Sequence, residues 1–402
     1  MNDPSFKPTK TDLLQGINPL LKTFGSSSNN IYPETFPDIG IGERKTIDIL
    51  SPIVFGGASH LGNPIAFAHM DPPTPWITWV TTLWNASLNQ NLLHPDVSPV
   101  AREFETKVVK WIAPFFGMDG GHMTPGATVS NLTALWVARD VAKINMIIAS
   151  KDAHLSIKKA ANILGLPFKE IKTLTNGSID TKALPHDLSR SALVLTAGTT
   201  STGAIDNLNI NKKVGWTHVD AAWAGPLRLS RIYGSCLDGI ENANSIAVSG
   251  HKWFFQPKES ALIFFRNTQE ANRTISSSSG YLSTDNVGLL GSHGAIGLPL
   301  LATLMAWGRN GLTERLEKSM ELSQQLWRQL ENHPKIKVFG PPVTGVILWR
   351  AKNAKDTRTL FSSLPSGSAS TTKLNGFDWI RHVAANPQAD IDKLWSAINK
   401  IL

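Results

Sequence analysis

Short apolar runs of strand length, separated by helical patterns, occupy the middle of this sequence and restrict the folds open to it. The runs are NMIIAS (145–150), ALVLTAG (192–198), WTHVDAA (216–222), SIAVSG (245–250) and ALIFFR (261–266). Strands that are buried on both faces inside a parallel sheet are typically apolar throughout. Helical patterns lie between several of the runs, for example AHLSIKKAANILG (153–165). This alternation predicts an α/β fold with a mostly parallel sheet.

The segment SPVAREFETKVVKWIAPFFG (98–117) precedes these runs and has helical periodicity. One helical face carries its apolar residues Val100, Phe104, Val108 and Ile112. The pattern predicts a helix that begins near Ser98, as a possible N-cap, and stops at Gly117.

The pattern changes near residue 312. A long amphipathic helix (312–332) leads to an extended run (336–351), a Ser-rich loop and a closing helix (389–402). This order predicts a small α+β domain. We therefore expect three parts: an N-terminal arm at 1–55 with a Ser- and Asn-rich segment (25–30), a large domain at 56–311, and a small C-terminal domain at 312–402.

Composition and charge limit the classes of partner. A chain of 402 residues with 42% hydrophobic content can bury a large core. It contains no apolar run of signal-peptide or membrane-span length, so we expect a soluble cytoplasmic protein without a membrane partner. A lone cysteine, Cys236, cannot form an internal disulfide. The net charge is +8, but the basic residues are scattered, which favours a solvated surface over a nucleic-acid partner.

Two charged residues follow predicted strands at positions where burial is expected. Asp220 ends the strand run WTHVD, and Lys252 comes just after SIAVSG. A buried carboxylate needs a cationic partner, and desolvation would lower the pKa of a buried lysine and make its amine nucleophilic. One interpretation is an internal ion pair between the two side chains. The other is a site in which the lysine forms a Schiff base and the acid faces a protonated ring nitrogen.

The stretch TPGATVSNLTAL (124–135) is a Gly-containing turn that opens a helix. Backbone N–H groups at such a helix start, with the hydroxyl of Thr128 nearby, can bind a phosphate dianion, although such turns are also common helix caps. With Lys252 and Asp220 this turn completes the set of parts that a pyridoxal phosphate site requires. The sequence gives no indication of a metal site.

Several stretches together resemble the group II pyridoxal-phosphate-dependent amino-acid decarboxylases, which include glutamate, aromatic amino-acid and diaminobutyrate decarboxylases. The resembling stretches are HVDAAWAGP, SGHKW, NQNLLHPDVSPVAREFE, TPGATVSNLTAL, DAHLSIKKAANILGL and TAGTTSTGAIDNL, in the family's order. The resemblance covers roughly residues 55–400. It implies the fold of PLP-dependent transferases (aspartate aminotransferase fold type I) and pyridoxal 5'-phosphate as cofactor.

The resemblance also implies roles for individual residues. Lys252 carries the cofactor as a Schiff base, Asp220 holds the pyridine nitrogen protonated, and His154 stacks on the ring. The remaining cofactor-binding residues that it implies are Gly126, Ala127, Thr128, Thr199, Ala222, Ser249 and His251. Tyr281 matches a mobile-loop tyrosine that protonates the reacting carbon, and Arg381 matches an arginine that binds a substrate carboxylate.

The implied reaction is decarboxylation of an L-amino acid to an amine and CO2. The alternative is another fold type I enzyme, such as an aldehyde-forming synthase, a lyase or an aminotransferase. By resemblance we expect a homodimer with the active site near the interface. The sequence departs from the common family pattern at Trp223, Gly250 and His293, and these departures put the substrate in doubt.

Overall fold

The computed structural model describes residues 9–22, 35–353 and 356–402, so the Ser- and Asn-rich segment 25–30 lies outside the described residues. The chain divides into two compact units, residues 1–60 and 61–402. The first unit contains α1 (Lys10–Ile17), a 3-10 helix (Asn18–Leu21) and α2 (Glu43–Gly57). A capping box of Thr9 and Asp12 begins α1, and Arg44 of α2 forms an ion pair with Asp12 at 2.7 Å. These polar contacts join the two helices.

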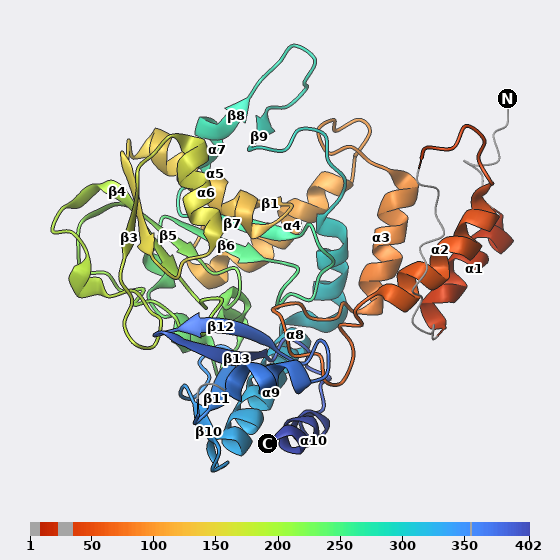
Figure 1. The fold of residues 1–402 in the computed structure, drawn as a ribbon. Coiled ribbons are helices and arrows are strands. Elements are labelled where there is room, and N and C mark those ends of the chain that lie inside the picture. The colour runs from red at the N-terminus through yellow and green to blue at the C-terminus, as the bar shows by residue number, and fades with distance from the viewer. Residues whose placement is uncertain (1–8, 23–34, 354–355) are drawn as a thin grey trace. The chain divides into compact units, whose positions relative to one another are not determined.

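The larger unit is built on a seven-stranded sheet in the order β1-β7-β6-β5-β4-β2-β3 (Figure 1). Its strands are β1 (Gly120–Thr124), β2 (Met146–Ser150), β3 (Phe168–Ile171), β4 (Leu188–Thr196), β5 (Val214–Asp220), β6 (Ser245–Ser249) and β7 (Ala261–Phe265). All neighbours from β3 to β6 are parallel. The predicted mostly parallel sheet is therefore confirmed.

Two features of the sheet differ from the sequence prediction. The run ALIFFR forms β7, but β7 is antiparallel to both β6 and β1. The link from β6 to β7 contains no helix, so the chain turns back and does not cross over. β1 was not predicted, because its sequence GGHMT lacks an apolar run. Gly121 is required there, since a Cβ at this position would lie 1.8 Å from the Ile263 carbonyl oxygen of β7.

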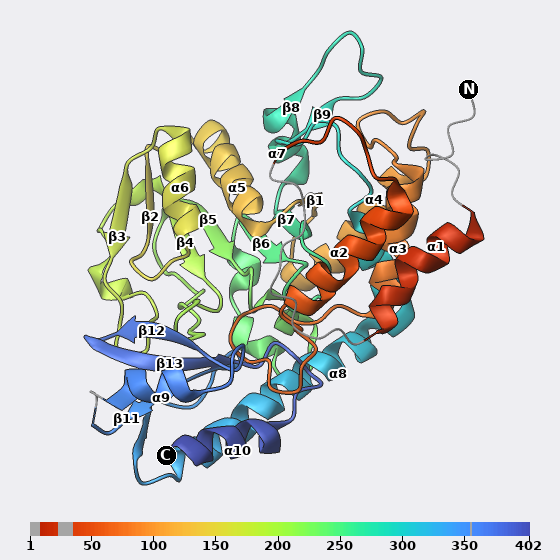
Figure 2. The same ribbon diagram turned by 45° about the vertical axis from the view of Figure 1, so that its right-hand side comes forward.

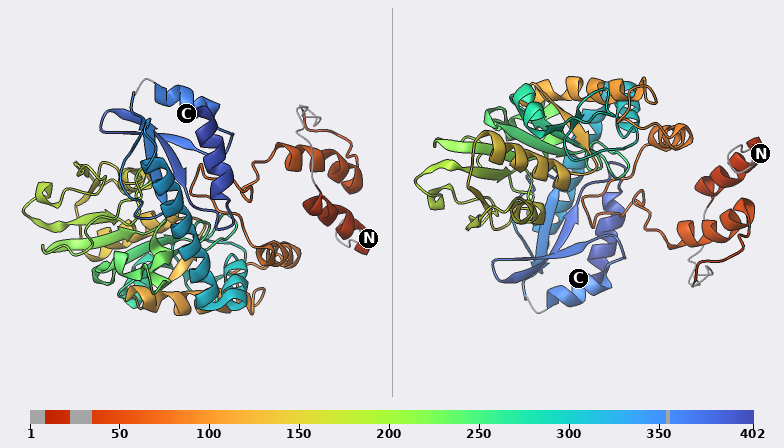
Figure 3. Two further views of the ribbon diagram at one scale, coloured as in Figure 1. Left: turned by 90° about the horizontal axis from the view of Figure 1, so that it is seen from below. Right: turned by 90° about the horizontal axis from the view of Figure 1, so that it is seen from above.

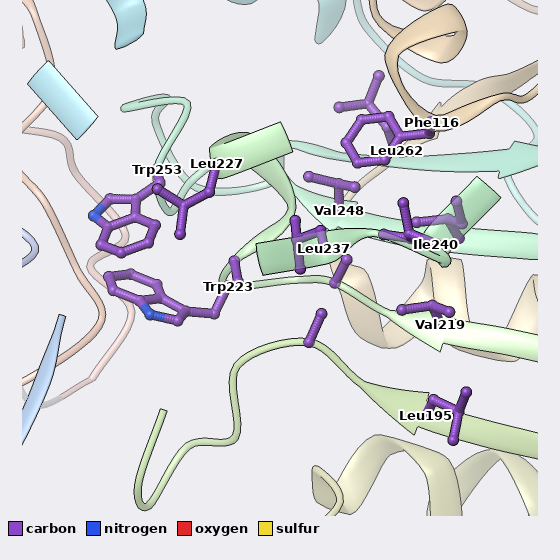
Figure 4. Packing of buried hydrophobic residues seen from close by; sticks show 14 of the residues in the cluster. Phe116, Leu195, Val219, Trp223, Leu227, Leu237, Ile240, Val248, Trp253 and Leu262 are labelled. Carbon is purple, nitrogen blue, oxygen red and sulfur yellow. The ribbon is translucent and has the colours of Figure 1, made fainter. Parts of the chain in front are cut away.

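Helices cover both faces of the large sheet. On one face, α5 (Ala127–Val141), α6 (Leu155–Leu164) and α7 (Thr268–Ile275) pack on the strands through residues such as Leu135 and Ile157. On the other face, Val108 and Ile112 of α4 (Ala101–Ile112) belong to the same core cluster as strand residues including Val219 and Val248 (Figure 4). The sheet is thus apolar on both sides, as the continuous apolar runs predict.

The helix predicted at 98–117 is shorter than expected. Its N-cap is Val100, which makes no side-chain cap hydrogen bond, whereas the Ser98 hydroxyl donates to the His94 carbonyl oxygen. The proposed Ser98 cap is therefore wrong. Gly117 ends the following 3-10 helix (Ala113–Phe116) with φ 67°, a left-handed conformation that glycine adopts without strain.

The C-terminal part has its own antiparallel sheet in the order β10-β11-β13-β12 (Figure 2). Its elements are β10 (Ile336–Val338), β11 (Val346–Ala351), α9 (Thr357–Ser363), β12 (Ser370–Leu374), β13 (Phe377–Val383) and α10 (Ile391–Ile401). β12 begins inside the Ser-rich segment that was expected to be a loop. α8 (Gly297–Glu331) runs from the large sheet to the C-terminal sheet, with non-helical backbone at Gly308 (Figure 3). The predicted boundary at 311/312 falls inside α8, and the three-part division stays a prediction.

A buried histidine joins two strands of the C-terminal sheet. His382 is fully buried, and its Nε2 accepts a hydrogen bond of 2.9 Å from the Trp349 indole N–H. Its Nδ1, 2.8 Å from the Ser368 carbonyl oxygen, must carry the proton of the neutral ring. Burial lowers the pKa of His382 to about 4.

Acid should therefore destabilise the protein through His382. Between its ordinary pKa of 6.5 and about 4, the unfolded chain binds a proton that the folded chain does not. The free energy of unfolding should fall with decreasing pH in this window by about 1.4 kcal/mol per pH unit for this group. Urea unfolding of His382→Gln at pH 5 and pH 7 should show a shallower pH dependence than wild type. Replacement of the exposed His186 by Gln should leave this pH dependence unchanged. An unchanged pH dependence in His382→Gln would contradict the role given to His382.

Candidate active site

A cavity of about 250 Å³ opens at the carboxyl ends of β4, β5 and β6, beside the start of α5. Ligands of open α/β sheets bind at this edge. Most of the predicted site residues line the cavity, namely Gly126, Ala127, Thr128, His154, Asp220, Ala222, Ser249, His251 and Lys252. Its other lining residues are Asn131, Thr196, Gly198, Thr200 and Trp223.

Asp220 is the last residue of β5 and is only 4% exposed. Its Oδ1 accepts a hydrogen bond of 3.1 Å from the Ala222 N–H, and its Oδ2 accepts one of 3.0 Å from the Asn131 side chain. Among the described residues, no ion pair within 4 Å joins Asp220 to Lys252. The interpretation of these two residues as an internal ion pair is therefore wrong, and the carboxylate remains available to a cation in the cavity.

A chain of buried hydrogen bonds behind Asp220 fixes its orientation. Asn131 Nδ2 must be the donor to the carboxylate, so its Oδ1 accepts from His218 Nε2 at 2.9 Å. His218 Nδ1 then accepts from the Ser245 hydroxyl at 2.9 Å, and that oxygen accepts from the Trp216 indole N–H at 2.8 Å. His218 is fully buried, and burial lowers its pKa to about 4, so the ring is neutral. Each hydrogen bond in this series is donated in the direction of Asp220.

The sequence analysis missed this chain of residues. Asn131 lies four residues into α5, and His218 lies two residues before Asp220 on the same strand. A histidine inside a strand run that is otherwise apolar was a signal that a buried polar partner exists. The identity of that partner depends on the packing of α5 against β5 and β6, which the sequence does not reveal.

His154 is the N-cap of α6 and faces the cavity. Its Nδ1 is 2.8 Å from the Ser156 hydroxyl and also accepts from the Ser156 N–H at 3.3 Å. Because Nδ1 accepts the backbone N–H, the neutral ring carries its proton on Nε2. Burial lowers the pKa of His154, which favours this neutral form.

Lys252 follows β6 and lines the same cavity. Desolvation lowers the pKa of its ammonium group, and the negative charge of Asp220 opposes that shift. A lysine with a lowered pKa has more of the neutral amine that acts as a nucleophile. Its neighbour His251 contacts the Ser260 carbonyl oxygen through Nδ1 at 3.1 Å, and burial lowers the pKa of His251 to about 4.

Ser260 also explains one departure from the family pattern. A Cβ at Gly250 would lie 2.2 Å from the Ser260 hydroxyl oxygen. The Gly250 N–H donates to the Ser260 carbonyl oxygen at 2.8 Å, so the two backbones are held close together. With serine at 260 and the two backbones this close, position 250 has no room for a side chain.

The start of α5 lines one end of the cavity. The first intrahelical hydrogen bonds are donated by the Val129 and Ser130 N–H groups to Gly126, which places the N–H groups of Ala127 and Thr128 ahead of them. The buried hydroxyls of Ser249 and Thr196 have no hydrogen-bond partner in the described chain. Such orphaned hydroxyls beside a helix start fit a phosphate group.

Trp223 closes the cavity on the side of the C-terminal sheet. Its ring lies against that of Trp253 (Figure 4), and the two rings stack with centroids 3.9 Å apart. Its indole N–H donates to the Thr344 carbonyl oxygen at 2.7 Å. A Cβ at Gly198 would lie 2.8 Å from the Trp223 ring, so the loop after β4 must approach it without a side chain.

Three predicted site residues do not line this cavity. Thr199 is not among the lining residues, and its hydroxyl contacts the Thr202 hydroxyl at 2.9 Å. Tyr281 is 70% exposed on the loop between β8 (Ser276–Ser277) and β9 (Asn286–Val287), where its ring centroid is 6.3 Å from that of His94. Arg381 is buried on β13.

Arg381 is held by several hydrogen bonds. Its Nε donates to the Thr200 carbonyl oxygen at 2.7 Å, and its Nη1 contacts the Ala68 carbonyl oxygen at 3.1 Å and the Ser370 hydroxyl at 3.0 Å. Burial lowers its pKa to about 10, although the negative charge of Asp71 opposes that shift. None of these bonds involves Nη2, which has no hydrogen-bond acceptor among the described residues.

The buried chain behind Asp220 gives a testable prediction. Asn131→Leu removes the donor to the Asp220 carboxylate, and a hydrogen bond to a charged group contributes about 1.5–3 kcal/mol. If that bond acts in the reaction, kcat should fall by about 10- to 150-fold. The measurement is steady-state kinetics together with the pH dependence of the bound cofactor's absorbance, which should shift. A fall in thermal stability without either change would indicate a purely structural role, and the exposed Asn162→Leu on α6 is the matched control.

Within the described ranges, no group of three or more His, Cys, Asp or Glu side chains could hold a metal ion. None of the helices in that part of the chain is long and apolar enough to cross a membrane.

Comparisons with known proteins agree with the geometry. The sequence matches a family model described as "Pyridoxal-dependent decarboxylase conserved domain" over residues 27–352. It is 27% identical over 414 residues to an L-2,4-diaminobutyrate decarboxylase of Rhizobium meliloti (strain 1021), which covers 92% of this chain and 83% of that protein. It is 24% identical over 382 residues to an aromatic-L-amino-acid decarboxylase of Bacillus atrophaeus. That alignment covers 86% of this chain and 77% of the relative.

The fold also matches solved structures. The crystal structure of mouse CSAD superimposes with a TM-score of 0.86 at 20% sequence identity, covering 98% of each chain. This likeness confirms the predicted fold class. The family description and the two relatives support the predicted decarboxylation over the alternative reactions on the same fold.

Proposed function

Since the chain belongs to the pyridoxal-dependent decarboxylase family and is a PLP-dependent amino-acid decarboxylase, we propose that the cavity bounded by Lys252, Asp220 and His154 is its active site. The observation that carries this proposal is the convergence of these three side chains with the orphaned Ser249 hydroxyl and the start of α5. They come from four separate segments of the chain.

The residues present fit pyridoxal 5'-phosphate, which when bound supplies the electron sink for the pair left by departing CO2. Lys252 would hold the aldehyde carbon of the cofactor through its amine. Asp220 would keep the ring nitrogen protonated, since a carboxylate with one oxygen on Asn131 and one on the Ala222 N–H cannot rotate freely. The Ala127 and Thr128 N–H groups and the Ser249 hydroxyl would bind the phosphate.

His154 has two roles in this proposal. Its ring would stack on the cofactor, opposite Ala222. Ser156 holds Nδ1 as an acceptor, so the Nε2 proton is the one that points away from α6 and is available to a substrate group. A neutral imidazole whose pKa is lowered by burial can donate a hydrogen bond without adding a charge.

We also propose a homodimer, as the resemblance to the decarboxylase family implies. Tyr281 does not line the cavity of its own chain. Its exposure on the loop between β8 and β9 leaves it available to close over a site, in the same chain or in a second copy. In either arrangement Tyr281 would protonate the reacting carbon. Thr199 would act by holding the loop that carries Thr200, and the Nη2 donor of Arg381 would bind the substrate carboxylate.

For the substrate we propose L-2,4-diaminobutyrate as the first candidate, on the similarity to the Rhizobium meliloti enzyme over 92% of the chain. A cytoplasmic location agrees with a single cysteine, Cys236, that cannot pair within the chain. The scattered basic residues do not form a nucleic-acid-binding patch, so we propose no such partner.

The test is CO2 release from purified, cofactor-loaded protein supplied with diaminobutyrate and with representative acidic, basic and aromatic L-amino acids. Mass spectrometry of the amine product identifies the substrate. We expect release from one class of amino acid. Absence of release across the panel, with the cofactor bound, would contradict the proposed substrates, and an aldehyde product would point to a synthase.

A further inference from the structure

A second cavity, of about 910 Å³, lies between the C-terminal sheet and loops of the large sheet. It is larger than the catalytic cavity of about 250 Å³ and shares none of its lining residues. One wall is formed by β10, β11 and β13, and the other by segment 204–208 with Cys236 and Asp238. It is therefore a separate site, to which nothing above assigns a role.

Arg350 of β11 is a buried cation on this wall. It is 6% exposed, its Nη1 donates to the Ala351 carbonyl oxygen at 3.1 Å, and its buried Nε has no partner in the described chain. Its guanidinium carbon lies 4.3 Å from the ring centroid of Phe377 and 5.4 Å from that of Trp379. Aromatic faces offset part of the cost of burying the charge, but they do not satisfy an N–H donor.

A second cation lines the cavity beside Arg350. Lys337 of β10 is the direct cross-strand partner of Arg350, and like charges in that position repel each other. Neither residue has a carboxylate within 4 Å among the residues that the structure describes. Arg350 is therefore a buried cation without an anionic partner in the described chain, and the exposed Lys337 lies beside it.

The carboxylates on the opposite wall are already engaged. Asp238 forms an ion pair with Arg228 at 2.6 Å. Asp206 accepts hydrogen bonds from the Ile179 N–H at 2.6 Å and the Thr196 N–H at 2.7 Å. Neither carboxylate is therefore free to neutralise the two cations.

The rest of the cation-bearing wall is apolar. Phe377 and Val343 line the cavity and are 43% and 47% exposed, unusually high values for such side chains on a concave surface. Phe339 and Trp379 pack edge to face, with centroids 5.6 Å apart, next to Leu348. A ligand for this wall needs an apolar body as well as a negative charge.

We propose that this cavity is a binding site for a small organic carboxylate with an aromatic or aliphatic body, separate from the substrate site. The carboxylate contacts Arg350 and Lys337, and the body covers Phe377 and Val343. The proposal does not depend on which amino acid the enzyme decarboxylates.

One short segment, residues 198–204, contributes lining residues to both cavities and connects the proposed site to the catalytic cavity. Thr202 and Ala204 line the new cavity, whereas Gly198 and Thr200 line the catalytic one. The Thr199 and Thr202 hydroxyls are bonded to each other, and Arg381, two residues after Trp379 on β13, donates to the Thr200 carbonyl oxygen. A ligand held against Trp379 and Thr202 would restrain this segment.

The test is calorimetry of the cofactor-loaded enzyme with 3-phenylpropanoate, compared with its neutral amide and with acetate. We expect one site per chain with a dissociation constant of about 0.1–1 mM, and binding at least about tenfold weaker for the amide and for acetate. Hydrogen exchange of the amides in 198–208 and 338–348 should slow when the probe is bound.

Variants on the wall complete the test. Lys337→Gln and Arg350→Gln should each weaken binding of 3-phenylpropanoate by about tenfold. Lys373→Gln, an exposed lysine of the same sheet that does not line the cavity, should leave it unchanged. If Arg350→Gln does not fold, the binding of 3-phenylpropanoate to Lys337→Gln and the binding of the neutral amide to wild type still test the proposal. Equal binding of acid and amide, an unchanged dissociation constant in Lys337→Gln, or exchange protection confined to the catalytic cavity would overturn the proposal.

Discussion

Lys252→Ala should reduce CO2 release by a factor on the order of 10⁴ or more, the size of loss seen when a covalent catalytic group is removed. Lys252 is the single amine that lines the catalytic cavity among the described residues. Desolvation lowers its pKa, so more of its amine is unprotonated than in an exposed lysine. No other lining side chain can replace that nucleophile. The measurement is steady-state CO2 release together with the absorbance of bound cofactor, which should be lost.

The matched control is Lys258→Gln. Lys258 lies six residues further along the chain, with a largely exposed side chain that forms an ion pair with Asp71. Exposed ion pairs contribute little to stability, so the activity of Lys258→Gln should stay within about twofold of wild type. Retention of more than a few per cent of activity in Lys252→Ala would remove Lys252 from the mechanism.

Asp220→Ala should keep the cofactor bound through Lys252 and still lose turnover by about 10²–10³-fold, the range for removal of one preorganised electrostatic contact. The buried carboxylate is held by the Ala222 N–H and by Asn131, so its charge faces the cavity without reorganisation. The substitution also removes the negative charge that raises the pKa of Lys252, so in the cofactor-free protein the pH at which the free amine titrates should fall.

Asp187→Ala is the comparison for this variant. Asp187 is exposed and accepts a hydrogen bond from the Ser189 N–H, far from the cavity lining. Its replacement should leave kcat and the titration unchanged. Near-normal kcat in Asp220→Ala with the cofactor bound would show that another group keeps the ring nitrogen protonated.

The parts of the site that the sequence predicted are those carried by single local segments. Asp220 and Lys252 stand directly after apolar strand runs, and the turn at 126–128 opens a helix, so their places at one sheet edge follow from the strand pattern. The run ALIFFR predicted strand β7, but the parallel direction expected for it was wrong. Direction depends on whether the link to the previous strand crosses over, and an apolar run carries no information on that.

The parts that were missed depend on contacts between distant segments. Asn131 and His218 are separated by 87 residues in sequence, and the local sequence around one does not identify the other as its hydrogen-bond partner. The hydrogen bonds of Arg381 to Thr200 and Ala68 likewise join segments 181 and 313 residues apart. Strand β1 was missed for a different reason, since its glycines are required by the backbone of β7 and look like a turn in the sequence.

The course of α8 determines how this chain can be dissected. Its first half and its middle, including Leu300, Leu316 and Met320, pack in a core cluster that contains large-sheet strand residues and also residues of β11 and β13, and its last turns, including Leu326 and Leu330, pack in the core of the C-terminal sheet. A fragment that begins at residue 312 would expose leucines that the large sheet normally covers, and a fragment that ends there would leave matching gaps in its core. Expressed separately, the two pieces should aggregate, whereas residues 61–402 should unfold in one cooperative transition.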